Sequence, residues 1–355
     1  MLDPVMDSRR AWLVGLSIFV GCQRAAEEAP DISSAFSSVL FLAPDSVIHS
    51  FPSDDVAVLE RSLALDVSDS SIAVGDISAG KVYRFSRDGA LRAVAGGKGE
   101  GPGELLLPIS VRLGNDESIW VSDTRNMRVT HYEASGQLIS TFRVPGAGDQ
   151  MVPIDDDGVL TPSSFGALLN LFHADGTFET ISDSAAWPAP LIHLQGIERV
   201  GMRSLLLARL NEETIFLLHN VPDFSSWKFQ IDFDERRLAS SESLSLPEWF
   251  ETSVRSRLSQ MQESLDKDGI ILVPFNAIHT SVPGTIWLTT GPLGSMIGAQ
   301  LPLDSEEGSI AVIATNGEKE GLLDAVLLKD RLVALYETGV RVYGLKEVEA
   351  PDRLW

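Results

Sequence analysis

Histidines are the first residues of this 355-residue chain that could do chemistry, because imidazole can act as a base or bind a metal near neutral pH. The six are His49, His131, His173, His193, His219 and His279. No two are close in sequence, and the HExxH spacing of zinc sites is missing. A fold that gathers distant segments at an axis could still assemble a metal site from them, but nothing in the sequence favours a metal.

Two groups of aspartates could bind calcium or catalyse. Asp155, Asp156 and Asp157 are consecutive, whereas a calcium loop of the EF-hand type needs alternate acids and a distant glutamate. A turn is therefore favoured. Asp76 and Asp123 occupy the same position of a repeat, and hydrogen bonds to a neighbouring turn explain this recurrence more simply than catalysis does.

A glycine-rich run at residues 96–103 could cradle a phosphate, but it lacks the required context. Gly99 stands where a phosphate loop needs Ser or Thr after Lys98, and Pro102 opposes the helix that must follow a dinucleotide fingerprint. The run is typical of a connection between repeats. Glu100 and Glu104 in this connection could project onto one face of the fold, so we take them as candidate ligand-binding residues.

Nucleophile motifs are equally sparse. Ser264 and Lys267 form an SxxK string, but the other motifs of serine acylases are missing, and no GxSxG occurs. The sequence therefore assigns no catalytic residue, no metal ligand and no cofactor.

The elements that would position any site come from an internal repeat. Residues 76–91 align without a gap on residues 123–138, at an offset of 47, and a third copy follows at an offset of 40. Each copy alternates short β-rich runs with tight turns that contain acids and glycine. Short strands at a fixed period predict the four-stranded blades of a β-propeller.

Later copies are fainter but keep an apolar anchor in one strand. The anchors are Ile72, Ile119, Val159, Ile215, Ile286 and Leu332. They predict an all-β, six-bladed propeller over residues 38–349, with a tail at 350–355; seven blades remain possible if residues 182–204 hide strands. A strand near residues 46–51 precedes the first full copy and could complete the last blade, which would close the ring.

Three positions in these copies carry structural predictions. Trp120 and Trp287 share a repeat position, which predicts packing between blades. Gly136 lies in a turn that should need a positive φ.

Two segments interrupt the repeat. Apolar residues at helical spacing predict an amphipathic helix over 247–265, and residues 291–308 are predicted to form a long loop. Long loops on rigid scaffolds often carry function, so Ser295 and Met296 are further candidate ligand-binding residues. We expect the helix and the loop to frame a pocket at one end of the ring; alternatively, the helix only caps the axial channel.

The second copy resembles an NHL repeat. The matching residues are Asp123, Asn126, Arg128, Val129, Tyr132, Gly136 and Leu138. Residues 96–111 are similar to the stretch between repeats of NHL-like six-bladed propellers found as bacterial lipoproteins. The resemblance implies the propeller fold; that family includes scaffolds, ligand binders and a few lyases, so it implies little about activity.

The N-terminus is typical of a signal peptide. Arg9 and Arg10 precede an eleven-residue apolar run that ends at Cys22, too short for the ~20 residues that span a bilayer. Met6 is an alternative start. Residues 19–22 resemble the lipobox of bacterial lipoproteins, although Phe19 departs from its usual leucine, and the resemblance implies that Cys22 is acylated. Residues 1–21 would be removed, and residues 22–37 would tether the domain.

The overall charge limits the partners. Acids outnumber bases by 50 to 28, a net charge of −22, so the surface repels nucleic acid and anionic lipid headgroups. A single cysteine excludes internal disulfides and thiolate zinc sites.

Together these features predict a lipid-anchored binding or scaffold module of the cell envelope. We expect it at the outer membrane, facing the periplasm or the exterior, with a protein, peptide or glycan as its partner and contact with the membrane only through the lipid. The alternative is an enzyme of the propeller lyase or lactonase type with an axial metal.

Overall fold

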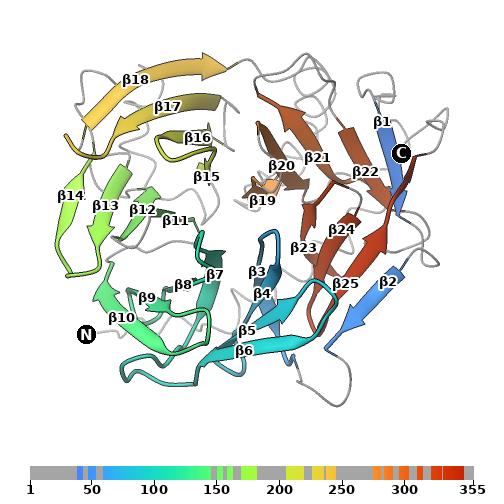
Figure 1. Ribbon diagram of the computed structural model, residues 1–355, viewed down its shortest axis with the longest axis horizontal. Coiled ribbons are helices and arrows are strands. Elements are labelled where there is room, and N and C mark those ends of the chain that lie inside the picture. Colours follow the sequence, from blue (N-terminus) through green and yellow to red (C-terminus); the bar gives the residue numbers. More distant parts are fainter. Residues whose placement is uncertain are drawn as a thin grey trace, which may run out of the picture.

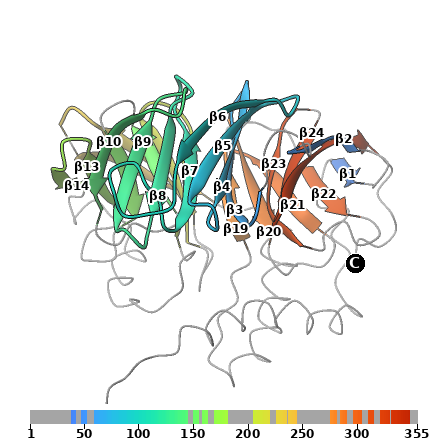
Figure 2. The same cartoon turned by 90° about the horizontal axis from the view of Figure 1, so that it is seen from below.

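The computed structural model describes a ring of β-sheets. The described residues are 38–42, 47–52, 59–144, 150–154, 158–162, 169–181, 205–219, 226–235, 237–244, 275–280, 284–290, 296–303, 310–314, 321–329 and 331–347. They form six sheets around a central axis (Figure 1). Seen from the side, the sheets stand next to one another at one level, as a disc (Figure 2). The predicted all-β, six-bladed propeller is confirmed.

The first three blades each contain four consecutive antiparallel strands. Blade 1 consists of β3 (Ser62–Val67), β4 (Ser71–Asp76), β5 (Lys81–Ser86) and β6 (Leu91–Gly96). Blade 2 consists of β7 (Pro108–Leu113), β8 (Ile119–Asp123), β9 (Arg128–Tyr132) and β10 (Leu138–Arg143). Blade 3 consists of β11 (Val152–Ile154), β12 (Gly158–Pro162), β13 (Leu169–His173) and β14 (Phe178–Thr180).

Blade 4 follows the same plan, whereas blades 5 and 6 include strands from the chain ends. Blade 4 consists of β15 (Leu205–Arg209), β16 (Thr214–His219), β17 (Ser226–Asp232) and β18 (Arg237–Leu244). Blade 5 consists of β19 (Phe275–His279), β20 (Thr285–Thr290), β21 (Met296–Pro302) and β22 (Ile310–Ala314), extended by β1 (Ser38–Leu42) and β26 (Lys346–Glu347). Blade 6 consists of β23 (Leu322–Leu327), β24 (Arg331–Tyr336), β25 (Gly339–Gly344) and β2 (Val47–Phe51).

The apolar anchors mark the second strand of every blade. All six side chains are fully buried, and each lies on β4, β8, β12, β16, β20 or β24. In five blades the residue paired with the anchor on the third strand is aromatic: Phe85, Tyr132, Phe172, Phe229 and Tyr343. An apolar pair in the middle of a sheet, covered on both faces by neighbouring blades, explains why these positions repeat along the chain.

The core lies between blades. Trp120 is fully buried and packs in a cluster that combines blade 2 with Val159 and Phe172 of blade 3. Trp287 occupies the same position in blade 5 and packs against Leu322 and other residues of blade 6. The predicted packing of both indoles between blades is confirmed.

Asp76 and Asp123 end the second strands of blades 1 and 2, and both are fully buried. Asp76 accepts hydrogen bonds from the backbone N–H groups of Glu60, at 2.5 Å, and Ser78, at 2.9 Å. Asp123 accepts hydrogen bonds from the N–H groups of Leu106, at 2.8 Å, and Leu107, at 3.0 Å. Each carboxylate therefore fixes the incoming chain to the next turn, as predicted, and this structural role explains the recurrence.

The N-terminal strands close the ring. β2 pairs with β25 and becomes the outermost strand of blade 6, as predicted, so the two ends of the domain meet in one sheet (Figure 1). β1 adds to blade 5, where it runs parallel to β22 and antiparallel to β26. Because the segment from β1 to β2 pairs with two successive blades, it joins them in addition to the direct connection of the chain.

Gly136 has the predicted positive φ, at 87°. A Cβ atom at this position would lie 2.5 Å from the carbonyl oxygen of Val94 on the outer strand of blade 1. Glycine is therefore required both by the backbone conformation and by the close approach of the neighbouring blade.

We expect Gly136→Val to lower the free energy of unfolding by more than about 1–2 kcal/mol, because both backbone strain and a clash arise. Gly176 provides a matched control, since its φ is 86° but a Cβ there would meet nothing within 4 Å. Gly176→Val should cost only the backbone strain. Urea denaturation of both variants measures the two losses of stability. A denaturation curve unchanged by Gly136→Val would contradict the assignment of a positive-φ turn at this position.

One predicted boundary is wrong. Residues 291–308 are not a single loop, because β21 occupies Met296–Pro302 and pairs with both β20 and β22. The sequence predicted a loop here because the strand contains Gly298 and Pro302, residue types that are common in loops. Gly298 is needed because a Cβ there would lie 2.2 Å from the ring of Trp287, so the glycine makes room for the buried indole.

Several other predictions fall outside the described residues. They are the signal peptide and Cys22, the tether at 22–37, the helix at 247–265, the aspartates at 155–157 and the tail at 350–355. Among the residues that the structure does describe, no helix is long and apolar enough to cross a bilayer.

Candidate functional site: an axial cavity

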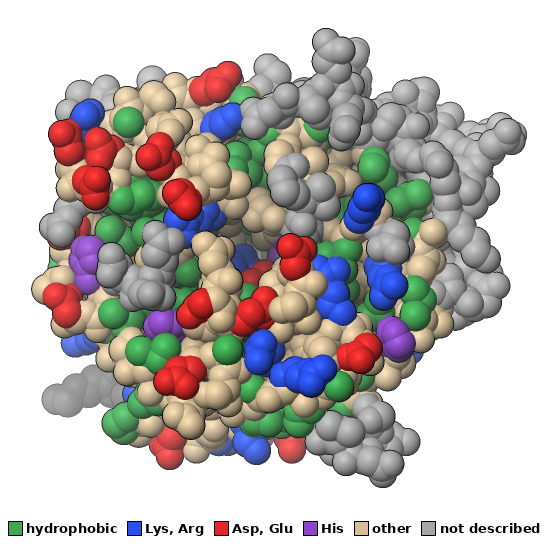
Figure 3. Space-filling model, viewed as in Figure 1, with side chains coloured by type: hydrophobic (Ala, Val, Ile, Leu, Met, Phe, Trp, Pro, Cys, Tyr) green, Lys and Arg blue, Asp and Glu red, His purple; other side chains and the backbone are tan. Residues whose placement is uncertain are grey.

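A cavity of about 1130 Å³ opens at the axis of the ring. Figure 3 shows a hollow near the centre of the molecule, with basic and acidic side chains around it. Its lining comes from the ends of the inner strands β3, β7, β11, β15 and β19 and from the turns that lead into β4, β8 and β16. Five of the six blades therefore contribute to one cavity.

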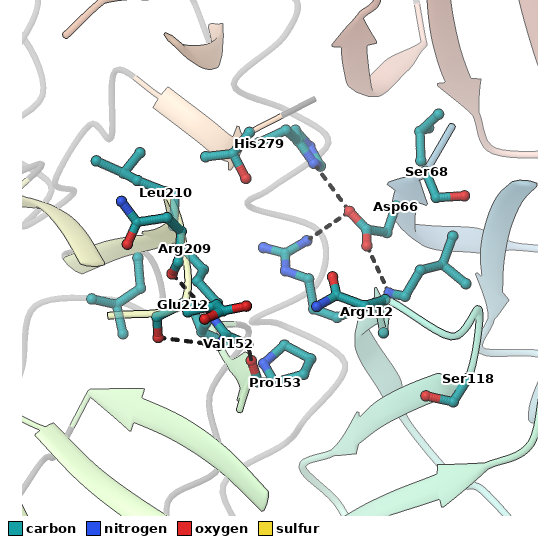
Figure 4. Close-up of a pocket in the computed structure, with 18 of the residues that line it drawn as sticks. Asp66, Ser68, Arg112, Ser118, Val152, Pro153, Arg209, Leu210, Glu212 and His279 are labelled. Atoms are coloured by element: carbon teal, nitrogen blue, oxygen red, sulfur yellow. Dashed lines mark hydrogen bonds and ion pairs between the residues drawn. The ribbon is translucent and has the colours of Figure 1, made fainter. Parts of the chain in front are cut away.

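Three charged residues at the cavity occupy equivalent positions in three different blades. Asp66, Arg112 and His279 lie on the inner strands, and each pairs with the residue directly after the anchor of its blade. The other three blades have Val152, Ala208 and Val326 at this position. Because the inner strands converge on the axis, these three residues, far apart in sequence, meet there (Figure 4).

His279 and Asp324 form the most buried ion pair of the site. Nε2 of His279 lies 3.2 Å from each carboxylate oxygen of Asp324 on β23. The side chain of His279 is 2% exposed and that of Asp324 is 10% exposed. The N–H of Ala325 donates to Asp324 at 2.7 Å, and the hydroxyl of Thr289 donates at 3.0 Å. The carboxylate is thus well supplied with donors.

Asp66 lies between the imidazole and the guanidinium. Its Oδ1 is 3.6 Å from Nδ1 of His279 and 3.7 Å from Nη1 of Arg112, and its Oδ2 accepts a 2.7 Å hydrogen bond from the N–H of Leu113. With His279 protonated, the two cations balance the carboxylates of Asp66 and Asp324. The cluster links blades 1, 2, 5 and 6 at the axis.

The pKa values follow from this arrangement. Burial alone would lower the pKa of His279, but attraction and hydrogen bonding to Asp324, together with Asp66, outweigh it, so the pKa is raised. Burial would raise the pKa of Asp324, but attraction and hydrogen bonds from His279, with those from Thr289 and the N–H of Ala325, hold it below its usual value. Both groups are therefore charged in the native protein near pH 6.

We expect this pair to give the folded protein a stability that depends on pH. A raised histidine pKa stabilises the fold below about pH 6.5, the value in the unfolded chain, and this contribution is lost as pH rises through the folded pKa. The lowered pKa of Asp324 stabilises the fold above about pH 4, and this contribution is lost as pH falls. Chemical denaturation from pH 5 to pH 9 should show the native protein losing stability over this range relative to His279→Gln. If the stabilities of the native protein and of His279→Gln changed with pH in parallel, the assignment of His279 and Asp324 as a charged pair would be contradicted.

The rim of the cavity is acidic. Five carboxylates line it: Asp69, Asp116, Glu117, Glu212 and Glu213. Two have cationic partners on blade 1, since Arg87 lies 3.5 Å from Asp69 and Arg84 of β5 lies 3.3 Å from Glu117. In the part of the chain that the structure describes, the other three have no ion pair.

Arg209 also lines the cavity, but its guanidinium is already occupied. Nη1 donates to the carbonyl of Pro153 at 3.0 Å, Nε to that of Asn211 at 3.1 Å and Nη2 to that of Glu212 at 3.1 Å. Arg209 therefore holds the turn between β15 and β16 against β11.

Glu100 and Glu104, two of the candidate ligand residues predicted from sequence, do not line the cavity. Glu100 and Glu104 belong to the connection between β6 and β7, at the end of the blades opposite to the turns that line the cavity. There Glu104 accepts a 2.7 Å hydrogen bond from the N–H of Gly101, and Arg128 donates to the carbonyls of both glutamates. Met296 is the first residue of β21, and Ser295 lies outside the described residues.

Of the histidines that the sequence singled out, His279 lines the cavity, whereas His131 and His173 lie elsewhere in the described residues. His131 stacks on Trp120, with ring centroids 3.6 Å apart, and His173 lies 3.4 Å from Glu179. Within the described residues, no three His, Cys, Asp or Glu side chains are grouped as a metal site would require.

The sequence did contain a signal for the axial cluster: charged residues in inner strands, where the other blades have Val or Ala.

Comparison with known proteins supports the fold. Residues 53–184 match the family DUF5128, described as a 6-bladed beta-propeller. No curated protein matches the chain. A candidate exported protein from Bacteroides fragilis is similar in structure with a TM-score of 0.52 and 12% identity, over 90% of this chain and 97% of that one.

Two further solved structures are similar to this chain. A member of the DUF4221 family from Bacteroides vulgatus has a TM-score of 0.53 and 10% identity, over 85% of this chain and 96% of that one. Virginiamycin B lyase from Staphylococcus aureus has a TM-score of 0.48 and 9% identity, over 83% of this chain and 98% of that one. At these identities the similarities to the two Bacteroides proteins show the fold alone.

Proposed function

We propose that the protein is a binding module of the cell envelope and that it takes a peptide or glycan in the axial cavity. The observation that carries the proposal is the cavity itself: about 1130 Å³, lined by charged and polar side chains that five blades hold in place. Rigid scaffolds with concave, partly polar pockets are where small ligands bind. The volume of the cavity exceeds the ~300–1,000 Å³ of most small-molecule sites. It therefore leaves room for several residues of a bound peptide or several sugar units of a glycan.

Native mass spectrometry tests this function with two defined probe sets, a library of tripeptides and a set of neutral and acidic oligosaccharides. We expect adducts with members of one set. Asn115→Trp, in an exposed turn at the rim, should narrow the entrance and weaken them. Gln137→Trp, in an exposed turn of the same blade that does not line the cavity, is the matched control. Adducts that are absent, or equally strong in both variants, would contradict the proposal.

The envelope location rests on the N-terminal sequence and on the similarity to a candidate exported protein. A basic start, a short apolar run and Cys22 together favour export and acylation of this cysteine, which would keep the propeller at the outer membrane. The resemblance of the second copy to NHL repeats fits a family that contains such lipoproteins.

We expect the native protein to enter the detergent phase on phase separation, because acyl chains partition with detergent. Cys22→Ser should leave a soluble or unprocessed form. Intact-mass analysis checks the modification directly, and a mature N-terminus beyond Cys22 without lipid would contradict it.

A further inference from the structure

Arg112 differs from Arg209, the other arginine of the cavity, because part of its guanidinium is uncommitted. Nε donates to the carbonyl of Met151 at 3.3 Å, and Nη1 donates to that of Val111 at 3.4 Å. Among the described residues no group accepts from Nη2. Figure 4 shows Arg112 near the middle of the cavity, with one terminal nitrogen directed to Asp66 and the other away from it.

The charge of Arg112 is only loosely compensated. Asp66 lies 3.7 Å from Nη1, longer than a hydrogen bond, and shares its carboxylate with His279 and the N–H of Leu113. A side chain that is 14% exposed, with free donors in a partly enclosed space, favours an anionic group of a ligand. A carboxylate is planar and matches the donors of a guanidinium.

The acidic rim, by contrast, favours positively charged groups of a ligand. Asp116, Glu212 and Glu213 are exposed and form no ion pair within the described part of the chain. A ligand that carries only negative charge would have to pass these carboxylates, which repel it. A ligand with a carboxylate at one end and ammonium groups further along meets both requirements.

We infer that the axial cavity binds a peptide by its C-terminal end, with the terminal carboxylate on Arg112 and its positively charged groups facing the acidic rim. The inference rests on the proposed binding function and names its ligand class. Peptides fit better than acidic glycans, because an acidic glycan supplies the carboxylate but no ammonium group. The expected contact is a hydrogen bond from Nη2 of Arg112 to the carboxylate.

Calorimetric titration with two probes tests the inference on the unaltered protein. The first probe is a tripeptide of one lysine followed by two alanines, with a free carboxylate. The second is the same peptide with a C-terminal amide. We expect the free acid to bind at least about tenfold more tightly, since the amide lacks the anion that Arg112 would bind.

Two sets of variants locate the two charges. Arg112→Gln should remove the preference for the free acid, whereas Arg143→Gln, on the exposed outer strand β10, should keep it. Glu212→Gln combined with Glu213→Gln should weaken binding of the lysine peptide severalfold and reduce its dependence on salt. Melting temperatures of all variants are measured in parallel, and the comparison of acid with amide needs no variant.

The outcomes separate this inference from the function it rests on. Equal binding of acid and amide by the native protein would overturn the inference, while a peptide-binding function would stand. Binding of oligosaccharides without any peptide would also overturn it and leave a glycan-binding function. Failure of every probe would contradict both.

Discussion

Phe51→Ala should lower the free energy of unfolding by about 3–5 kcal/mol, one of the largest effects expected for a single substitution in this protein. Phe51 ends β2, the N-terminal strand that completes blade 6, and it is 3% exposed. Its ring lies 4.9 Å from that of Phe85 in blade 1. The side chain thus fills the junction between the last blade and the first, and its loss would leave a cavity where the ring closes.

Ile48→Ala is the matched control, since Ile48 lies on the same strand but is 44% exposed. Its effect should stay within about 0.5 kcal/mol. Equilibrium denaturation in urea gives both values. Equal effects of the two substitutions would mean that β2 does not stabilise the closed ring through the buried face of Phe51.

Asp324→Ala should destabilise the protein by a similar amount, about 3–5 kcal/mol, because it leaves His279 buried without its principal partner. Nearly all of the imidazole is inaccessible to water, so solvent cannot replace the carboxylate. Asp234→Ala, in the exposed turn between β17 and β18, removes a carboxylate with no such role and should change stability little.

A double-mutant cycle measures the interaction itself. If Asp324 and His279 form one buried pair, replacing both by alanine should cost clearly less than the sum of the single effects. Additive effects would show that the two residues act independently, and the axial cluster would then have to be described as separate contacts.

The blades were predictable because their signals are local and repeated. An anchor such as Ile72 recurs with its aromatic partner in the next strand, so sheet pairing leaves a periodic trace in the sequence. Asp76 and Gly136 were interpretable for the same reason: a turn imposes its requirements within a few residues. The strand β21 was missed because a glycine that accommodates Trp287 has the same appearance in sequence as a glycine in a loop.

The axial cavity was not predictable in the same way. Asp66, Arg112 and His279 stand at equivalent positions of three inner strands, but they are far apart in sequence, and nothing local shows that they are neighbours. They become neighbours only when the ring has closed and the inner strands are aligned. Glu100 and Glu104 lie in the predicted connection between repeats, but hydrogen bonds within this connection hold it together.

An experimental structure of the protein with the lysine-containing tripeptide bound would show directly where and how the peptide binds. We predict density for the peptide in the axial cavity, with its carboxylate within hydrogen-bond distance of Nη2 of Arg112 and its lysine toward Glu212 and Glu213. A peptide bound at the opposite end of the ring, near Glu100 and Glu104, or an axial cavity that stays empty at saturating peptide, would contradict the account.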